Sequence, residues 1–342
     1  MIADLLARLG DPRPLGAAEA RRLWDRLTAP SASEAERAVL LYAVSVRRPA
    51  PAELAHLAGA LRARGRPFRV PAADRPIDLC GSGGAPRASY NVSTVSAFVV
   101  AAAGVPVLKH GNRSARGRSG SSDLLLALGL PIDRRSAFAR RCYDRERLAF
   151  LHAPLYHPVL ARLAPARRSI GVPTVLNRLG PLAHPARPTA QVTGVPTPAD
   201  TGPTADALRR LGVRRGVTMA SADGCDEFSP HRTTQAVFWE GRSMRRQRID
   251  PAHFLTAEER SGSWSALPPA TAAEEAERIL DGGGGARRGS VLLTSGAALW
   301  AAGAVPTLAD GVDRARTVLD GGGAAAKLAA LRTIAARFGG DR

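Results

Sequence analysis

Residues 77–84 read Ile-Asp-Leu-Cys-Gly-Ser-Gly-Gly, a short β-prone run that ends in a glycine-rich turn. Residues 91–94, Asn-Val-Ser-Thr, then open an apolar stretch of helical character. Strand, polar turn and helix in this order are the repeating unit of α/β sheets. Backbone amides in such a turn, together with the positive end of the helix, suit an anion such as phosphate. Alone, Gly-Ser-Gly-Gly is more often a plain turn, and it lacks the Gly-Lys-Ser/Thr of a P-loop.

The alternation of β-prone and helical segments continues along the chain and predicts its fold class. Four helical stretches come first, at 2–9, 17–28, 34–46 and 51–64. The β-prone runs after residue 80 are 105–108, 149–151, 190–195, 217–220, 236–239 and 291–293. Helical patterns return at 271–281, 295–303, 307–319 and 324–338. We therefore predict an α/β protein with a helical domain over 1–69 and a larger domain with a mainly parallel sheet over 70–342.

The composition is globular but strongly basic. The 342 residues carry 48 Lys+Arg against 30 Asp+Glu, a net charge of +18, which by itself suggests nucleic acid or an anionic membrane as a partner. Only Lys109 and Lys327 are lysines, however, and the arginines are spread over nearly every segment. The charge therefore indicates little about partners, and nucleic acid is not expected among them.

Cysteine usage and hydropathy predict the compartment. Three cysteines far apart in the sequence, Cys80, Cys142 and Cys225, fit neither a disulfide framework nor a zinc site and indicate a reducing compartment. The N-terminus has the apolar spacing of a helix face rather than a signal peptide, and the longest apolar run, 95–108, is too short for a bilayer. We expect a cytoplasmic protein without a membrane partner.

A second polar loop follows the β-prone run that we expect to end at Lys109. This loop, 110–121, leads into a helix starting near Ser122, and both helix N-termini are predicted at the same edge of the sheet. Four cations precede the first acid of the segment, Asp123: Lys109, Arg113, Arg116 and Arg118. The combination predicts a site for a heavily phosphorylated small molecule, although the arginines could equally form a solvated surface.

Two further clusters carry chemically useful groups. Asp226 and Glu227 follow the run 217–220, and adjacent carboxylates after a strand can hold Mg²⁺ together with phosphate oxygens. Alone they would more often be a solvated pair. Arg167 could clamp a carboxylate, or simply lie on a helix surface. His157, before a proline, is more often structural than catalytic, whereas His110 follows Lys109 in the predicted anion loop.

Six ordered motifs together resemble the anthranilate phosphoribosyltransferase family. They occupy residues 78–84, 91–94, 109–114, 119–123, 177–186 and 223–227, and Lys-His-Gly-Asn-Arg at 109–113 is the most specific. The resemblance implies a helical domain that also forms a homodimer contact, a hinge, and a nucleoside-phosphorylase-type α/β domain. It implies that 155–183 returns to the helical domain. The implied reaction moves the phosphoribosyl group of phosphoribosyl diphosphate, with Mg²⁺, to anthranilate or a related aromatic amine, as in tryptophan biosynthesis.

The resemblance also implies roles for individual residues. The acceptor would meet His110, Asn112, His157 and Arg167, with Arg167 reading its carboxylate. The metal would be held by Ser93, Asp226 and Glu227. No side chain is expected to act covalently, because Lys109 and the metal would stabilise the leaving diphosphate electrostatically. The donor-binding residues would be Gly81, Ser82, Gly83, Gly84, Asn91, Ser93, Thr94, Lys109, Arg116 and Ser119.

This chain departs from the family pattern at four places. Ala85 replaces an Asp, Arg116-Gly117 replaces Ser-Ser, Leu126 replaces an acid, and His184 replaces an Asn. Three of these lie at or beside the expected donor site. We hypothesise that Arg116 substitutes a charge-assisted contact to diphosphate for the serine hydroxyls. An Arg116→Ser variant with unaltered donor KM and kcat would disprove this.

The departures leave other functions open. One is phosphoribosyl transfer to an aminoglycoside-like amino alcohol in antibiotic biosynthesis, although a polycation would be repelled by the net charge of +18 and by Arg167. A pyrimidine nucleoside phosphorylase would show phosphorolysis of thymidine or uridine. A non-catalytic nucleic-acid-binding homologue would show steeply salt-dependent binding and no use of phosphoribosyl diphosphate.

Overall fold

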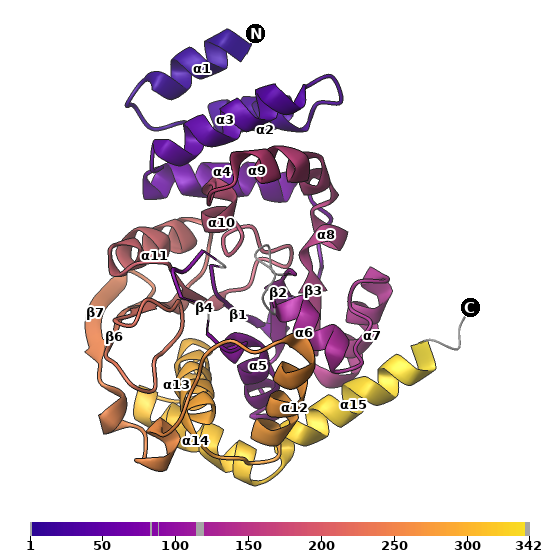
Figure 1. The fold of residues 1–342 in the computed structure, drawn as a ribbon, viewed down its shortest axis with the longest axis vertical. Coiled ribbons are helices and arrows are strands. Elements are labelled where there is room, and N and C mark those ends of the chain that lie inside the picture. The colour runs from indigo at the N-terminus through magenta and orange to yellow at the C-terminus, as the bar shows by residue number, and fades with distance from the viewer. Residues whose placement is uncertain (1, 83, 88, 114–119, 339–342) are drawn as a thin grey trace.

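The computed structural model describes residues 2–82, 84–87, 89–113 and 120–338 (Figure 1). Predictions that concern Gly83, Arg116, Gly117, Arg118 and Ser119 lie outside the described residues. An N-terminal layer of helices lies at one end of the molecule, the sheet lies in the middle, and the C-terminal helices cover the opposite end (Figure 1).

The N-terminal layer consists of four helices whose limits match the predicted ones closely. They are α1 (Ile2–Gly10), α2 (Ala17–Thr28), α3 (Glu34–Val46) and α4 (Pro51–Ala63). Ser33 and Glu36 form a capping box at the start of α3, and Pro51 opens α4. Trp24 is fully buried between α2 and α4, and its indole N–H donates to the Leu57 carbonyl at 2.9 Å.

A seven-stranded sheet forms the centre, in the order β3-β2-β1-β4-β5-β6-β7. The first five of these strands in that order are parallel to one another, and β6 and β7 are antiparallel additions at one edge. The predicted mainly parallel sheet is thus confirmed. The strands are β1 (Ile77–Cys80), β2 (Val107–Gly111), β3 (Leu148–His152), β4 (Ala190–Gly194), β5 (Arg215–Ser221), β6 (Thr234–Glu240) and β7 (Ser243–Ile249).

Two strand predictions need correction, and one strand was not predicted. Residues 291–293 lie inside helix α13 (Ala286–Ala301), which is buried on nearly all sides, so that its apolar residues are not confined to one face and show no helical period. Strand β2 begins later than predicted and continues to Gly111, which places Lys109 and His110 within the strand instead of at its end. Strand β7 was not predicted, because an exposed arginine-rich edge strand has no apolar alternation.

Two hydrophobic cores lie on the two faces of the sheet. Phe238 of β6 faces the core around α5 (Val92–Ala102) and α13, while its neighbour Trp239 faces the core shared with α4 and α11 (Thr201–Arg210). The other helices are α6 (Ser121–Ala127), α7 (Ser136–Glu146), α8 (Ala153–Tyr156), α9 (Ala164–Ile170), α10 (Val175–Leu179), α12 (Pro269–Leu280), α14 (Leu308–Asp320) and α15 (Gly323–Phe338). Short 3₁₀ turns occur at Ala72–Asp74, Pro158–Leu163, Pro198–Asp200, Pro251–His253 and Glu258–Arg260.

Helices α9 and α10 pack on the N-terminal layer although they follow β3 in the chain (Figure 1). Apolar side chains of both helices join the core of α2, α3 and α4. The Val175 backbone N–H donates to Ser45 Oγ at 2.8 Å, and Ser169 Oγ donates to Glu34 at 2.7 Å. The precise division into domains at residue 69 stays a prediction. Within the described residues, no helix is both long and apolar enough to cross a bilayer.

Candidate active site

The loop after β1 contacts the loop after β5 at the carboxyl edge of the sheet. Ser82 donates from both its backbone N–H and its hydroxyl to one carboxylate oxygen of Asp226, at 2.7 and 2.9 Å. The Gly84 N–H donates to Ser82 Oγ at 3.1 Å. A Cβ at Gly81 would lie 2.8 Å from the same Asp226 oxygen, so glycine permits this close approach. The two loops that were predicted separately therefore form one unit.

A second set of contacts joins the start of α5 to Lys109 and Glu227. The Ser93 N–H donates to Glu227 Oε1 at 3.3 Å, while Ser93 Oγ accepts from Lys109 Nζ at 3.1 Å. Lys109 Nζ also donates to the Leu79 carbonyl at 2.6 Å. Both Lys109 and Glu227 are almost completely buried, at 3% and 4% exposure. The ammonium group of Lys109, within β2, thus meets the Ser93 hydroxyl and two carboxylates beside the ends of β1 and β5.

The electrostatics of this cluster suit a cation. Burial, assisted by the neighbouring Asp226 and opposed by Lys109, raises the pKa of Glu227 to about 8. Glu227 Oε2 has no hydrogen-bond partner among the described residues. Only two carboxylates converge here, and the described residues contain no group of three or more metal-ligating side chains. A pair of carboxylates with one unused buried oxygen fits Mg²⁺, which takes few protein ligands and completes its shell with phosphates and water.

Three histidines form a row beside β2. The ring centroid of His110 lies 5.4 Å from that of His157 and 5.5 Å from that of His184, in edge-to-face geometry. All three are buried, and burial lowers the pKa of each, so the rings are neutral near pH 7. His110 Nε2 and both ring nitrogens of His157 have no hydrogen-bond partner among the described residues. These nitrogens are buried, so the row consists of neutral rings whose hydrogen-bonding capacity is not filled by the described side chains.

The remaining predicted donor residues lie near this edge, but with different degrees of exposure. Asn91 is the residue before α5, and its carbonyl accepts from the N–H of Thr94, a fully buried residue. Arg113 belongs to the cations predicted to serve phosphate, but it pairs with Asp133 at 2.7 Å. Asn112 is exposed, and its side-chain oxygen accepts from the Arg113 N–H.

Arg167 lies on α9, in the helical layer. Its side chain is half-buried and forms no hydrogen bond or ion pair among the described residues, and burial lowers its pKa. Its neighbour Arg168 is exposed. Among the described residues, Arg167 contacts neither the histidine row nor the carboxylates. The predicted role of Arg167 therefore requires an acceptor that reaches from the histidine row to α9.

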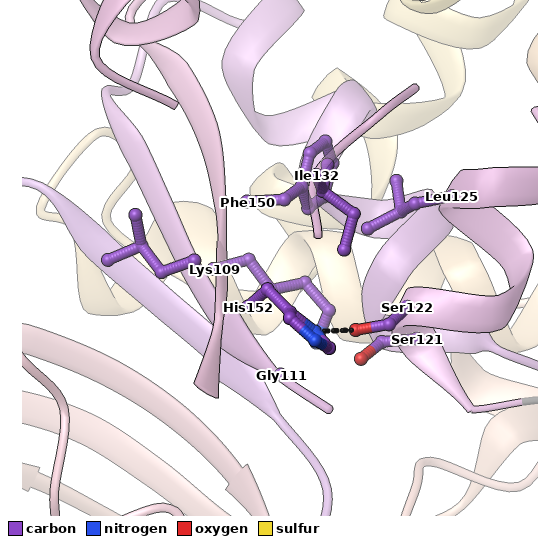
Figure 2. Close-up of a pocket in the computed structure, with 9 residues that line it drawn as sticks. Lys109, Gly111, Ser121, Ser122, Leu125, Ile132, Phe150 and His152 are labelled. Atoms are coloured by element: carbon purple, nitrogen blue, oxygen red, sulfur yellow. Dashed lines mark hydrogen bonds between the residues drawn. The ribbon is translucent and has the colours of Figure 1, made fainter. Parts of the chain in front are cut away.

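A narrow recess lies on the other side of Lys109, between β2, β3 and α6 (Figure 2). Ser122 Oγ and His152 Nδ1 lie 2.9 Å apart across it, and His152 points toward Ser122 in Figure 2. The recess is too narrow to admit a water molecule. Its hydrogen bond anchors the start of α6 to β3.

Three residues at the site were not assigned a role from the sequence. Asp78 is fully buried and accepts the His110 N–H at 3.0 Å, which holds β1 to β2. Gly194 ends β4 directly under Asp226, where a Cβ would overlap the Asp226 carbonyl. His184 was noted only as a departure from the family pattern. An acid inside an apolar strand is the signal that could have marked Asp78, whereas nothing local marks Gly194.

Comparisons with known proteins agree with this arrangement. Residues 73–325 match the glycosyl transferase family a/b domain, and residues 3–65 match its helical bundle domain. The anthranilate phosphoribosyltransferase of Methylobacterium radiotolerans is 39% identical over 310 residues, 91% of this chain and 89% of the relative. Anthranilate phosphoribosyltransferase 2 of Streptomyces coelicolor is 39% identical over 300 residues, 88% of this chain and 89% of the relative.

Solved structures give the same result. The crystal structure of anthranilate phosphoribosyltransferase from Thermus thermophilus superposes with a TM-score of 0.89 at 35% identity, covering 97% of this chain and 99% of that one. The enzyme from Saccharomyces cerevisiae in complex with PRPP and Mg shares the fold, with a TM-score of 0.86 at 20% identity and 98% coverage of both chains. The chain therefore belongs to the anthranilate phosphoribosyltransferase family of glycosyl transferases and is an enzyme of the pentosyltransferase type.

Proposed function

We propose that this enzyme transfers the 5-phosphoribosyl group from phosphoribosyl diphosphate to anthranilate and releases diphosphate, a reaction of tryptophan biosynthesis. The observation that carries the proposal is the pairing of two unlike sites. One is the buried cluster of Lys109, Ser93, Asp226 and Glu227, and the other is a set of neutral histidines with unused ring nitrogens. The first suits a polyanionic donor and the second an aromatic acceptor. The relatives named above support this assignment.

The donor would bind across the loops after β1 and β5 and the start of α5. Gly81, Ser82 and Gly84 form the turn, and Asn91, Ser93 and Thr94 lie at the positive end of α5. Lys109 uses two of its three N–H donors on Leu79 and Ser93, which leaves one for a phosphate oxygen. The positive end of α5 and a directed ammonium group would therefore face the diphosphate beside the turn.

Asp226 and Glu227 would hold Mg²⁺ at this edge, with Ser93 beside them. Bound there, Mg²⁺ would neutralise charge that develops on the leaving diphosphate. The chain's own contribution is to fix the carboxylates in advance. Ser82 donates twice to Asp226, and Ser93 donates to Glu227, so neither carboxylate has to reorganise when the donor arrives.

The acceptor would lie between the histidine row and α9, with its carboxylate on Arg167. A half-buried guanidinium without an acidic partner has already lost part of its hydration and gains from a bidentate carboxylate. The imidazole rings of His110 and His157, packed edge to face, would lie beside the aromatic amine. The exposed Asn112, at the end of β2, would contact the acceptor from the side of the sheet. No side chain needs to form a covalent intermediate, because positioning and charge stabilisation suffice.

The first experiment incubates the enzyme with phosphoribosyl diphosphate, Mg²⁺ and a panel of acceptors, and measures diphosphate release. The panel contains anthranilate, its two positional isomers, 2-aminobenzamide and an aminoglycoside-like amino alcohol. We expect release with anthranilate at a kcat/KM at least 10-fold above every other acceptor. Release only with the amino alcohol, or with no acceptor, would refute the proposal.

The second experiment tests the carboxylate contact. Arg167→Met should lower kcat/KM for anthranilate by about 10- to 100-fold, since a charged hydrogen bond contributes about 1.5–3 kcal/mol. The variant should affect the uncharged 2-aminobenzamide far less. Arg168→Met, one residue along the same helix and exposed, is the matched control. Equal losses in the two variants would disprove the role of Arg167.

We further propose that two copies pair through the helical layer. Three large apolar side chains lie on one exposed face of α3, namely Val39, Tyr42 and Val46, with exposures of 48%, 52% and 57%. Their i, i+3, i+7 spacing marks one stripe of the helix. A homodimer mass in light scattering, lost in Tyr42→Asp, would support the pairing, and a wild-type monomer would refute it. We place the enzyme in the cytoplasm, in keeping with three buried free cysteines.

A further inference from the structure

His184 is held by two hydrogen bonds that fix its tautomer. The Ala186 N–H donates to Nδ1 at 3.0 Å, so Nδ1 must carry a lone pair. Nε2 lies 2.8 Å from the Leu108 carbonyl, which accepts and therefore requires the proton on Nε2. A protonated ring would turn Nδ1 into a donor facing another donor. The contacts thus select one neutral form of a side chain that is only 2% exposed.

The same ring packs against His110. The two ring centroids lie 5.5 Å apart at an interplanar angle of 64°. The backbone N–H of His110 is tied to Asp78 Oδ1, and His184 Nε2 lies 4.0 Å from that same oxygen. The His184 ring therefore packs against one side of the His110 ring. The His157 ring packs against another side, with the two ring centroids 5.4 Å apart. The His110 ring is therefore packed between two other imidazoles, with its Nε2 buried and unpartnered among the described residues.

The family pattern has Asn where this chain has His184, and the two residue types share one of these functions. An Asn side chain commonly accepts the N–H two residues ahead of it, which is the bond that His184 Nδ1 makes with Ala186. Asn is too short to reach the Leu108 carbonyl as well, and it provides no ring against His110. His184 therefore makes two contacts that an Asn would not make: the hydrogen bond from Nε2 to the Leu108 carbonyl in β2, and the packing of its ring against His110.

We propose that His184 is a positioning residue that sets the acceptor specificity of this enzyme by holding the His110 ring in place. The inference depends on the proposed function, because it assigns His110 to the acceptor side of the site. A fixed row of flat imidazoles favours a planar aromatic amine over a flexible amino alcohol, since a rigid wall cannot follow a flexible ligand. His184 itself touches neither donor nor metal.

The test compares His184→Asn, His184→Phe and the matched control His56→Asn. His56 is a half-buried histidine of α4 that bonds the Leu15 carbonyl and lies outside the row. We expect His184→Asn to raise the anthranilate KM at least 10-fold while the KM for phosphoribosyl diphosphate stays within 2-fold. His184→Phe keeps a ring beside His110 and should keep the anthranilate KM within 3-fold. His56→Asn should change neither.

The proposal is overturned if His184→Asn leaves the anthranilate KM within 2-fold of wild type. It is also overturned if both KM values rise together, or if His184→Phe is as impaired as His184→Asn. The KM comparison requires a wild-type enzyme that is active on anthranilate. A wild-type enzyme without this activity would refute the proposed function and not the role of His184.

A measurement without substrate separates the two failures. NMR of the ¹⁵N-labelled histidine rings should show His184 protonated on Nε2 and a single sharp set of His110 signals in the wild type. His184→Asn should broaden or double the His110 signals, and His56→Asn should not. An unchanged His110 spectrum in His184→Asn would overturn the positioning role, whether or not the enzyme accepts anthranilate.

Discussion

Gly194→Ala should impair donor use although Gly194 bears no reactive group. A Cβ at this position would overlap the Asp226 carbonyl oxygen and lie 2.6 Å from its carbon, while ordinary contact begins at 3.4 Å. The Asp226 carbonyl oxygen, 1.6 Å from that Cβ, must therefore retreat by about 1.8 Å to reach ordinary contact. That movement stretches both hydrogen bonds from Ser82 to Asp226, which are 2.7 and 2.9 Å long.

A misplacement of about 1 Å at a site that works by positioning can lower the rate about 100-fold. We expect kcat/KM for phosphoribosyl diphosphate at saturating acceptor to fall by roughly that factor. The strain of overpacking should also lower the free energy of unfolding by about 1–3 kcal/mol. Initial rates of diphosphate release and urea unfolding measure the two effects separately.

Gly59→Ala is the matched control, because its Cβ would meet nothing within 4 Å and Gly59 lies inside α4. Alanine there should raise the free energy of unfolding by about 0.5–1 kcal/mol and leave the kinetics unaltered. Gly194→Ala with a wild-type kcat/KM for the donor would show that Asp226 does not need its observed place.

Three other changes test the same site. Glu227→Gln should raise the Mg²⁺ concentration for half-maximal activity at least 10-fold; an unchanged Mg²⁺ requirement would exclude Glu227 as a ligand. Lys109→Met should lower kcat about 10²–10³-fold, as loss of an oxyanion donor does, and a kcat within 5-fold of wild type would argue against its contact with diphosphate. His157 has its pKa lowered to about 4 by burial, against 6.5 when unfolded. The native state then binds fewer protons at His157, so this residue should lower the free energy of unfolding by about 2 kcal/mol between pH 7 and 5. His157→Gln should remove this part of the pH dependence and leave the part that the other buried histidines contribute; an equal slope in the variant would contradict the assignment.

The fold was predictable because its signals are local. Capping residues and apolar spacing gave the first four helices, and short β-prone runs gave six of the strands. The failures also have local causes. Residues 291–293 are apolar on every side of a buried helix, so periodicity cannot separate helix from strand. Strand β7 is polar on both faces, since it ends the sheet and is covered by no further strand among the described residues.

The two halves of the candidate site differ in how far sequence alone could describe them. The donor side is assembled from loops that directly follow β1 and β5 and from the start of α5, and parallel strands bring such loops together at one edge. The contacts of Ser82 with Asp226 and of Ser93 with Glu227 are therefore expected once the strands are placed. The sequence motifs of these loops are therefore sufficient to predict most of the donor side.

No comparable rule places the residues of the proposed acceptor side. They come from elements that meet only when the chain returns to the helical layer. His110 belongs to β2, His157 follows α8, and His184 follows α10. The linker after α4 holds the neighbours of His157 and His184. The Arg66 N–H donates to the Tyr156 carbonyl at 2.7 Å, and the Phe68 N–H donates to the Pro185 carbonyl at 3.3 Å. Acceptor geometry is thus set by the packing of two layers, whereas donor geometry is set by one sheet. We therefore expect His184→Asn to alter the proposed acceptor side while the loops of the proposed donor side keep their contacts.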